Sequence, residues 1–378
     1  GMGARAGEAK HFLRLIRPWA PLLAAPSIYV LLQAVPLPYA ENPIWRATRD
    51  ALNEPVLGFV SVDPGSTLRA FGVSLLIVTL TLVAAVTSIE PRRAQRLLFV
   101  LIGTSVIAAL VLFFGSFGLR LDRSLTAVLL ASSALGFIFC AAGCLYVVER
   151  MGIERTEPKK NRFASLLMLV IFSAAAAICA LALLRVASSQ AIFATACGFV
   201  VLGALVVARR LGVGFSVASG IVFVPILLAL FIAAAQTRGS GDATIRFAST
   251  VQAAAIGPLV ADASIFGSGA GTLGKLLPIY GIHKPSDFTA TAASILTVEI
   301  GRAGLGLLAL VAICATLLLI RGAIVRNRYS YFPAAAASSI ILVGLGAFVD
   351  SSLFKTPILI LLAAVVGLGL AQSVSRTL

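Results

Sequence analysis

The sequence predicts an all-α, polytopic membrane protein of about ten transmembrane helices with one large extracytoplasmic loop. The first observation is the composition, because 59% of the 378 residues are hydrophobic, only 12% are charged, and the mean hydropathy is +1.02. Ordinary soluble domains carry about 25% charged residues, so the chain is excluded from that class. The second observation is a series of apolar runs, each long enough to cross about 30 Å of hydrocarbon as a helix.

The expected spans are residues 19–38, 67–88, 97–117, 125–148, 163–184, 191–208, 214–236, 292–320, 332–349 and 357–374. The first run lacks the short core and the small-residue cleavage site of a signal peptide, so we expect it to be retained as a span. We expect residues 1–378 to form a single transmembrane domain.

The orientation follows from the distribution of basic residues. The side that includes both termini carries about 18 of the 30 Lys and Arg residues and about 5 of the 15 acidic residues. Both termini are therefore expected in the cytoplasm, and the long connections 39–66 and 237–291 are expected on the outer face. The net charge of +15 is explained by this asymmetry and by attraction to anionic lipid, so no nucleic-acid partner is expected.

The second long connection contains a glycine-rich stretch, PLVADASIFGSGAGTLGKLLPIYGI (258–282). A nucleotide cradle needs a strand before its glycines, a helix after them and a soluble domain around both. The predicted topology offers no strand here and faces away from cytosolic nucleotides. We therefore expect Gly267, Gly269 and Gly271 to let the loop turn tightly and re-enter near the membrane surface.

The cysteines give no indication of a metal site, whereas the few charges within the spans single out one helix. The cysteines all fall in predicted spans, where we expect them to pack as small apolar residues, with neither a disulfide framework nor a metal site: Cys140, Cys144, Cys179, Cys197 and Cys314. The span interiors are almost free of charge, except for Glu299 and Arg302, whose spacing of three places them on one face of a helix. An ion pair between these two, or with a neighbour, is the simpler interpretation.

Three segments in order resemble the O-antigen ligase and polysaccharide polymerase superfamily. They are VADASIFGSGAGTL (260–273), preceded by Arg246 at the beginning of the loop, then TVEIGRAGLGLL (297–308), and then VDSSLFKTPILILLAAVVGLGL (349–370). The outer segment NPIWRATRDALNEPVLGFVSVDPGSTLRA (42–70) resembles the exopolysaccharide-polymerase branch of that superfamily. Specific motifs cover about a quarter of the chain, so their order and spacing carry the resemblance.

The resemblance implies a metal-independent membrane glycosyltransferase without a cofactor. Such an enzyme moves a glycan from a polyprenyl (undecaprenyl) diphosphate carrier to a sugar hydroxyl, at the periplasmic face of the bacterial inner membrane. Arginine is suited to a diphosphate because its planar fork binds phosphate oxygens in pairs, and we expect Arg246, Arg185, Arg302 and Arg69 to bind it. The hydroxyl acceptor needs a base or an orienting group, for which we expect Glu299, His283 and Asp287.

The sequence departs from the family pattern at one important place. The family's His-Asn pair should fall near Ala290 and Thr291, where this chain reads FTATAASILTVE. His283 is the only histidine expected on the outer side. The family's Ser-Arg signature is also blurred, appearing as RVASSQ (185–190), which bears on the role of Arg185.

Two other functions stay open. A catalytically inactive scaffold subunit of an exopolysaccharide complex would explain the missing His-Asn pair. A transporter of polysaccharide or lipid-linked sugar would be expected to line its span interiors with charges, which this chain largely lacks. The expected partners are the lipid-linked glycan donor, the glycan acceptor, membrane lipid and other polysaccharide export proteins.

Overall fold

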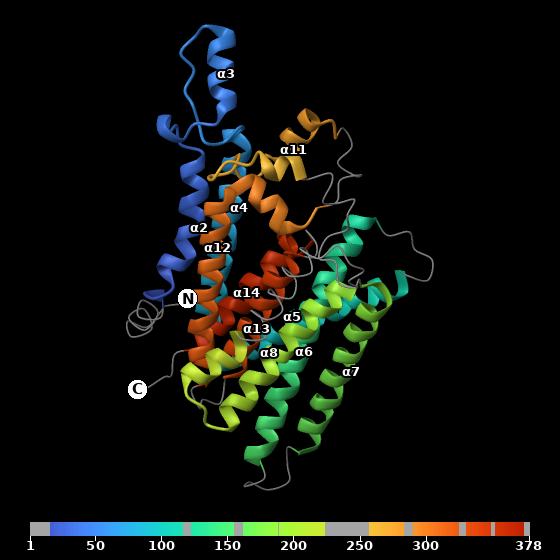
Figure 1. Ribbon diagram of the computed structural model, residues 1–378. Coiled ribbons are helices and arrows are strands. Elements are labelled where there is room, and N and C mark those ends of the chain that lie inside the picture. Colours follow the sequence, from blue (N-terminus) through green and yellow to red (C-terminus); the bar gives the residue numbers. More distant parts are fainter. Residues whose placement is uncertain are drawn as a thin grey trace, which may run out of the picture. The chain divides into compact units, whose positions relative to one another are not determined.

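The computed structural model describes residues 16–115, 122–154, 162–187, 189–223, 257–282, 290–324, 330–348 and 352–373, and these are almost entirely helical (Figure 1). The elements are α2 (Ala20–Gln33), η1 (Pro38–Ala40), α3 (Pro43–Leu52), α4 (Pro64–Thr87), α5 (Pro91–Gly115), α6 (Arg123–Glu154), α7 (Arg162–Val186), α8 (Ser189–Arg210), α11 (Leu273–Leu276), η2 (Leu277–Tyr280), α12 (Ala292–Ile324), α13 (Tyr331–Gly346), η4 (Ser352–Phe354) and α14 (Thr356–Ser373). Residues 215–223 and 257–261 are also helical.

Seven of the helices in this part of the chain are long and apolar enough to cross a membrane: Pro64–Thr87, Pro91–Gly115, Ser124–Met151, Phe163–Val186, Ala191–Arg210, Ala292–Ile324 and Thr356–Ser373. They correspond to seven of the ten predicted spans. Two further predicted spans are shorter apolar helices, Ala20–Gln33 and Tyr331–Gly346. The predicted span 214–236 is described only through residue 223, and the predicted loop 237–291 only over 257–282 and from residue 290 onward. The count of ten and the extent of the loop stay predictions.

The chain forms two compact units. Unit 1 consists of Gly1–Thr79, Phe247–Cys314 and Ala347–Ser351, and unit 2 of Leu80–Arg246, Ala315–Gly346 and Ser352–Leu378. Helices α4 and α12 each contribute to both units.

In unit 1, α2 runs beside the first half of α4 and beside α12 (Figure 1). The hydroxyls of Ser27 and Ser74 are 2.6 Å apart across the first pair of helices. The Tyr29 hydroxyl donates to the Ile300 carbonyl oxygen, at 2.8 Å, across the second pair. These polar contacts tie together helices whose other surfaces are apolar.

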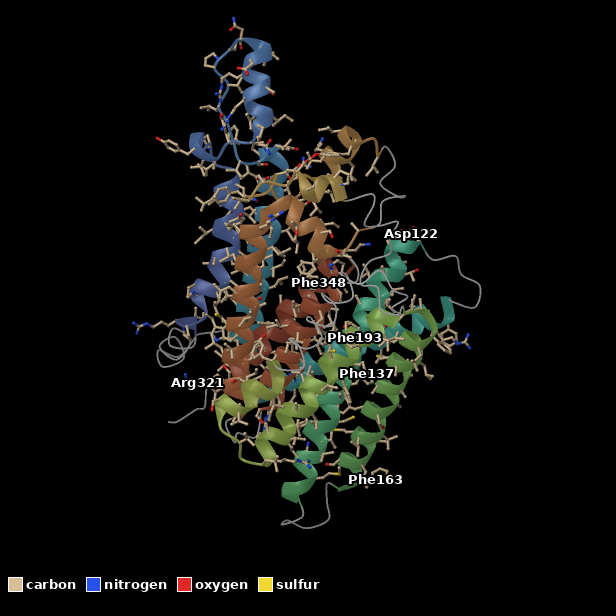
Figure 2. All side chains as sticks on the ribbon, in the orientation of Figure 1. Asp122, Phe137, Phe163, Phe193, Arg321 and Phe348 are labelled. Atoms are coloured by element: carbon tan, nitrogen blue, oxygen red, sulfur yellow. The ribbon has the colours of Figure 1, made fainter. Side chains whose placement is uncertain are left out.

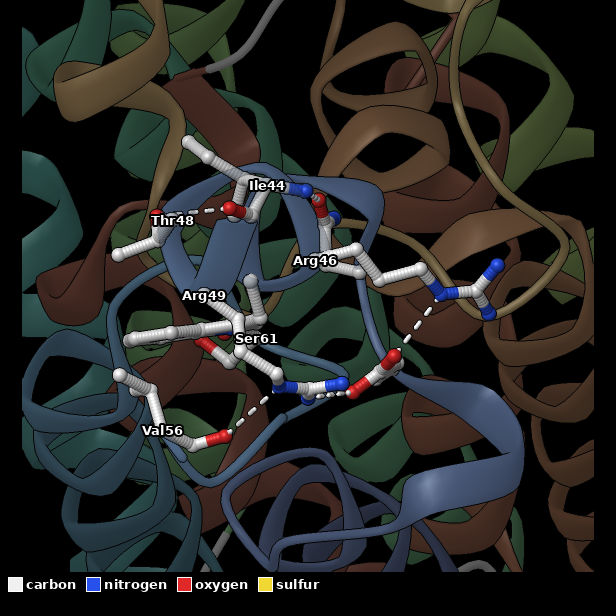
Figure 3. A network of polar contacts seen from close by, with 9 residues as sticks. Ile44, Arg46, Thr48, Arg49, Val56 and Ser61 are labelled. Atoms are coloured by element: carbon white, nitrogen blue, oxygen red, sulfur yellow. Dashed lines mark hydrogen bonds and ion pairs between the residues drawn. The ribbon is translucent and has the colours of Figure 1, made fainter. Parts of the chain in front are cut away.

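A small helical hairpin connects α2 to α4 and is held by a buried carboxylate (Figure 3). The Asn42 side chain accepts the Ile44 N–H at the start of α3, and Asn53 ends the helix in the left-handed conformation, which asparagine tolerates. Glu41, whose side chain is 8% exposed, accepts from Arg46 at 2.8 Å and from Arg49 at 2.7 Å. The Trp45 ring packs on Phe59 and closes the hairpin.

In unit 2, α13 is the central helix, and almost every residue along it is buried. Its small residues allow this: Gly369 of α14 leaves room for Ala336, and Gly198 of α8 leaves room for Leu342. A second apolar cluster joins α5 to α7 and contains Cys179, which packs there as expected of a small apolar residue. Many large apolar side chains on the outer helix surfaces are exposed, which suits contact with lipid.

Candidate functional site

The glycine-rich stretch and the middle of α12 form one interlocked backbone structure in unit 1. All three predicted loop-shaping residues, Gly267, Gly269 and Gly271, have positive φ, at 83°, 106° and 78°. Other residues adopt this region only with strain. The glycine turn, defined here as residues 265–272, therefore depends on glycine at each of these positions.

Helix α12 is interrupted where the glycine turn meets it. Gly301 has φ 70° and ψ 179°, a conformation open essentially to glycine alone. The interruption frees backbone groups that a regular helix would pair internally. A Cβ on Gly301 would overlap the carbonyl oxygen of Ile265, and a Cβ on Gly267 would overlap that of Glu299. The two segments thus approach at a distance that only paired glycines permit.

Backbone hydrogen bonds join the two segments directly. The N–H of Ser268 donates to the Val298 carbonyl oxygen at 2.9 Å, and the N–H of Gly269 donates to the Glu299 carbonyl oxygen at 2.9 Å. The N–H of Ala303, beyond the interruption, donates to the Ile265 carbonyl oxygen at 3.1 Å. These bonds pair backbone groups that the interruption of α12 would otherwise leave without partners.

Gln33, at the end of α2, binds both segments at once. Its Nε2 donates to the Phe266 carbonyl oxygen at 2.7 Å and to the Glu299 carbonyl oxygen at 3.2 Å. Its Oε1 accepts the N–H of Ala270 at 3.1 Å. Gln33 is 2% exposed, and its single amide pairs with three backbone groups of the two segments.

The segment that leads into α4 is hydrogen-bonded to the glycine turn. The N–H of Val62 donates to the Ser268 carbonyl oxygen at 2.7 Å. Asp63 accepts from the backbone N–H groups of Gly65 and Ser66 and from the Ser66 hydroxyl. These bonds lower the pKa of Asp63, with a smaller contribution from the charge of Lys275. The start of α4 is therefore capped by an ionised carboxylate.

Among the described residues, Glu299 is the only acidic residue at the interruption of α12. Its Oε1 accepts the N–H of Leu273, at 3.3 Å, where the glycine turn passes into α11. Its carboxylate is thereby held against the turn rather than pointing along a helix surface. Arg302 is exposed and forms no ion pair with Glu299. The expectation that the two share a helical face is wrong, because the helix is interrupted at Gly301, between them.

The other predicted diphosphate-binding arginines take no part in this carboxylate contact or lie outside the described residues. Arg69 is exposed on the first turns of α4, next to Ala70, which lies against Gly271. Arg185 belongs to unit 2, at the end of α7, where its guanidinium lies 5.8 Å from the centre of the Phe113 ring. Arg246, His283 and Asp287 lie outside the described residues.

The position where the family resemblance predicts a His-Asn pair is occupied by packing and capping residues. Ala290 is 7% exposed and packs with Leu259 and Val298. Thr291 accepts the N–H of Ser294 on its hydroxyl, at 3.2 Å, and so caps the start of α12. Neither residue can accept a proton near neutral pH. No group of three or more metal-ligating side chains occurs in the parts of the chain that are described.

Sequence reasoning missed Gln33, Tyr29 and Gly301. A lone glutamine and a lone tyrosine in the first apolar run were the available signals, because polar groups in such runs must find partners. Gly301 stood within the quoted TVEIGRAGLGLL motif, but nothing in the letters separates it from Gly304 or Gly306. Comparison of the sequence with family models and with curated proteins gives no significant match.

Proposed function

We propose that this chain is a multi-pass membrane glycosyltransferase of the polymerase or ligase type, acting on a glycan carried by a polyprenyl diphosphate. The observation that supports this proposal is the pairing of two of the three separate segments that carry the family resemblance. The glycine turn pairs with residues 298–303, and the N–H of Ala293 at the start of α12 donates to the carbonyl oxygen of Ala347, at 2.9 Å. Ala347 precedes the third segment by two residues.

The chemistry requires few groups, all of which the chain contains. A bond forms between the acceptor oxygen and the anomeric carbon, the bond from that carbon to the diphosphate breaks, and the acceptor proton leaves. Arg302 and Arg69 in unit 1, with Arg246 and Arg185, are the proposed cations for the leaving diphosphate. Glu299 orients or deprotonates the acceptor, with His283 and Asp287 as further candidates. No metal or cofactor is part of this proposal.

The orientation proposed for this reaction places the glycine turn and residues 237–291 on the periplasmic face of the inner membrane, with ten spans and both termini in the cytoplasm. It rests on the excess of basic residues on the side of the termini. A single cysteine introduced at Ser240 should react with a membrane-impermeant thiol reagent in intact cells. Reaction only after permeabilisation would reverse the orientation.

Transfer from a lipid-linked donor by the purified protein tests the function. We expect Arg246→Ala and Arg302→Ala to abolish transfer and Arg302→Lys to restore part of it, since an ammonium group lacks the planar fork. Glu299→Gln should have a larger effect than His283→Ala. Arg17→Ala is the matched control. Arg17 is an exposed arginine just before α2, at the opposite end of that helix from Gln33, which contacts the glycine turn.

A scaffold subunit is the second candidate, and the packing of Ala290 favours it. An alanine that fills an apolar cluster where the family has a histidine is what loss of a catalytic base would leave. Absence of transfer by the folded, unmodified protein with its native donor would select the scaffold. Full transfer by the Glu299→Gln, His283→Ala double variant would instead remove both residues from the mechanism.

A further inference from the structure

One end of unit 2 collects arginines from four helices. We define the basic end surface as Arg92, Arg93 and Arg96 at the start of α5, Arg150 near the end of α6, Arg209 and Arg210 at the end of α8, and Arg321 near the end of α12. Asp122, before α6, and Phe163, at the start of α7, lie at opposite ends of the pair formed by α6 and α7 (Figure 2). Arg150 lies near the end of α6, and therefore at the Phe163 end of this pair.

Contacts within unit 2 bring these helix ends together. Arg209 of α8 forms an ion pair with Glu149 of α6, and both side chains are largely buried. The ring of Tyr146, one turn earlier in α6, lies 5.2 Å from the ring of Tyr331 at the start of α13. The ends of α6 and α8 and the start of α13 are therefore one packed surface.

The remaining helices join this surface through α14. Gln372 near the end of α14 donates from Nε2 to the Ser88 carbonyl oxygen, at 2.5 Å, just before α5 begins. Gly322 of α12 leaves room for Ser373 of α14. The start of α5 and the end of α12 are thus both fixed to the end of α14.

The charges on this surface exceed the acids that the described residues offer. Glu90 forms an ion pair with Arg93 at 2.9 Å, and Glu149 is occupied by Arg209. In the described ranges the exposed residues Arg92, Arg96, Arg210 and Arg321 have no ion-pair partner. The surface therefore carries uncompensated positive charge.

The placement of Arg92 does not serve the stability of its own helix. The first turn of α5 contains no acidic residue. The N-terminal end of a helix is positive, so a cation in the first turn is repelled by it and adds no stability. An external anion would relieve this repulsion.

The neighbouring surface is apolar in the direction of the membrane. Val100 lies one turn beyond Arg96 on the same face of α5 and is 59% exposed, and Phe163 at the start of α7 is 80% exposed. A free phosphate ion gains no binding energy from apolar side chains, whereas a phospholipid has a phosphate for the arginines and acyl chains for the apolar side chains. We propose that the basic end surface binds the headgroups of anionic phospholipids in the adjoining leaflet.

Lipid titration of the full-length protein in detergent, followed by native mass spectrometry, tests this proposal. We expect phosphatidylglycerol to bind more tightly than phosphatidylcholine. The triple variant Arg92→Gln, Arg96→Gln, Arg210→Gln should weaken phosphatidylglycerol binding on the order of a hundredfold, since each basic residue near an anionic surface contributes about fivefold. The matched control is Arg46→Gln, an exposed arginine of α3 in unit 1. It should leave the affinity unchanged.

The corresponding triple lysine variant separates charge from folding, and it should keep most of the affinity because the positive charge remains. Unchanged phosphatidylglycerol binding in the glutamine variant would overturn the proposal, as would equal binding of phosphatidylcholine by the unmodified protein. An equal loss in Arg46→Gln would show that the effect is not local to this surface. Displacement of the lipid by excess inorganic phosphate would reassign the surface to a small anion and also overturn it.

Discussion

Replacing Gly301 by alanine should strongly destabilise unit 1. The backbone conformation at Gly301 lies in the region that essentially only glycine adopts, and an alanine there costs about 1–3 kcal/mol. Its Cβ would also overlap the carbonyl oxygen of Ile265. That atom belongs to the backbone of the glycine turn, so no side-chain rotation can remove the overlap.

The overlap should separate the glycine turn from α12 and break the hydrogen bonds between them. The bonds at risk are those from the N–H groups of Ser268, Gly269 and Ala303. Each contributes about 1 kcal/mol. With the backbone strain, the expected loss is about 4–6 kcal/mol, which is a large fraction of the total stability of a typical domain.

Gly306→Ala in the same helix is the matched control. A Cβ at Gly306 meets nothing within 4 Å. Alanine is also favoured over glycine inside a helix, by about 1 kcal/mol in water. The control should therefore be as stable as the parent or slightly more so.

Thermal unfolding of the purified protein in detergent, measured as the fraction that stays monodisperse after heating, gives the comparison. We expect a clearly lower apparent Tm or a low folded yield for Gly301→Ala, and no loss for Gly306→Ala. An apparent Tm for Gly301→Ala equal to that of the parent would refute the close backbone pairing. The same loss in both variants would show that the helix, and not its interruption, is sensitive.

The remaining predictions concern Gln33 and Glu41. Gln33→Leu leaves the buried Ala270 N–H without its acceptor and removes one of the donors to each of the carbonyl oxygens of Phe266 and Glu299, so it should lower the free energy of unfolding by about 1–3 kcal/mol. Gln95→Leu, at a half-buried position in α5, should change it little in the same heating assay. Hydrogen bonds from Arg49 and then Arg46 lower the pKa of Glu41, so its ion pairs stabilise the α3 hairpin above the ordinary carboxyl pKa and this stabilisation is lost as the pH falls through the lowered value. Amide hydrogen exchange, corrected for its intrinsic pH dependence, should show the hairpin opening more at low pH in the parent, and a Glu41→Gln variant that keeps the same pH dependence would contradict this.

The membrane class and most of the helices could be predicted from the letters alone. Long apolar runs such as 97–117 and 125–148 correspond to α5 and α6, because a span of hydrocarbon demands an apolar helix of a certain length whatever surrounds it. The special backbone of Gly267, Gly269 and Gly271 was also predictable. Glycine at alternate positions in an otherwise apolar stretch has few other uses.

The interlocked site could not be predicted in the same way. Spacing alone placed Glu299 and Arg302 on one helical face, but the tertiary structure interrupts α12 at Gly301 and separates them. Likewise, the partners of Gln33 lie more than two hundred residues away, at 266, 270 and 299. The sequence by itself determined which segments are apolar helices and where glycine allows the chain to turn. Only the tertiary structure decided which turn meets which helix, because a broken helix is stable only where distant groups pair with its freed backbone groups.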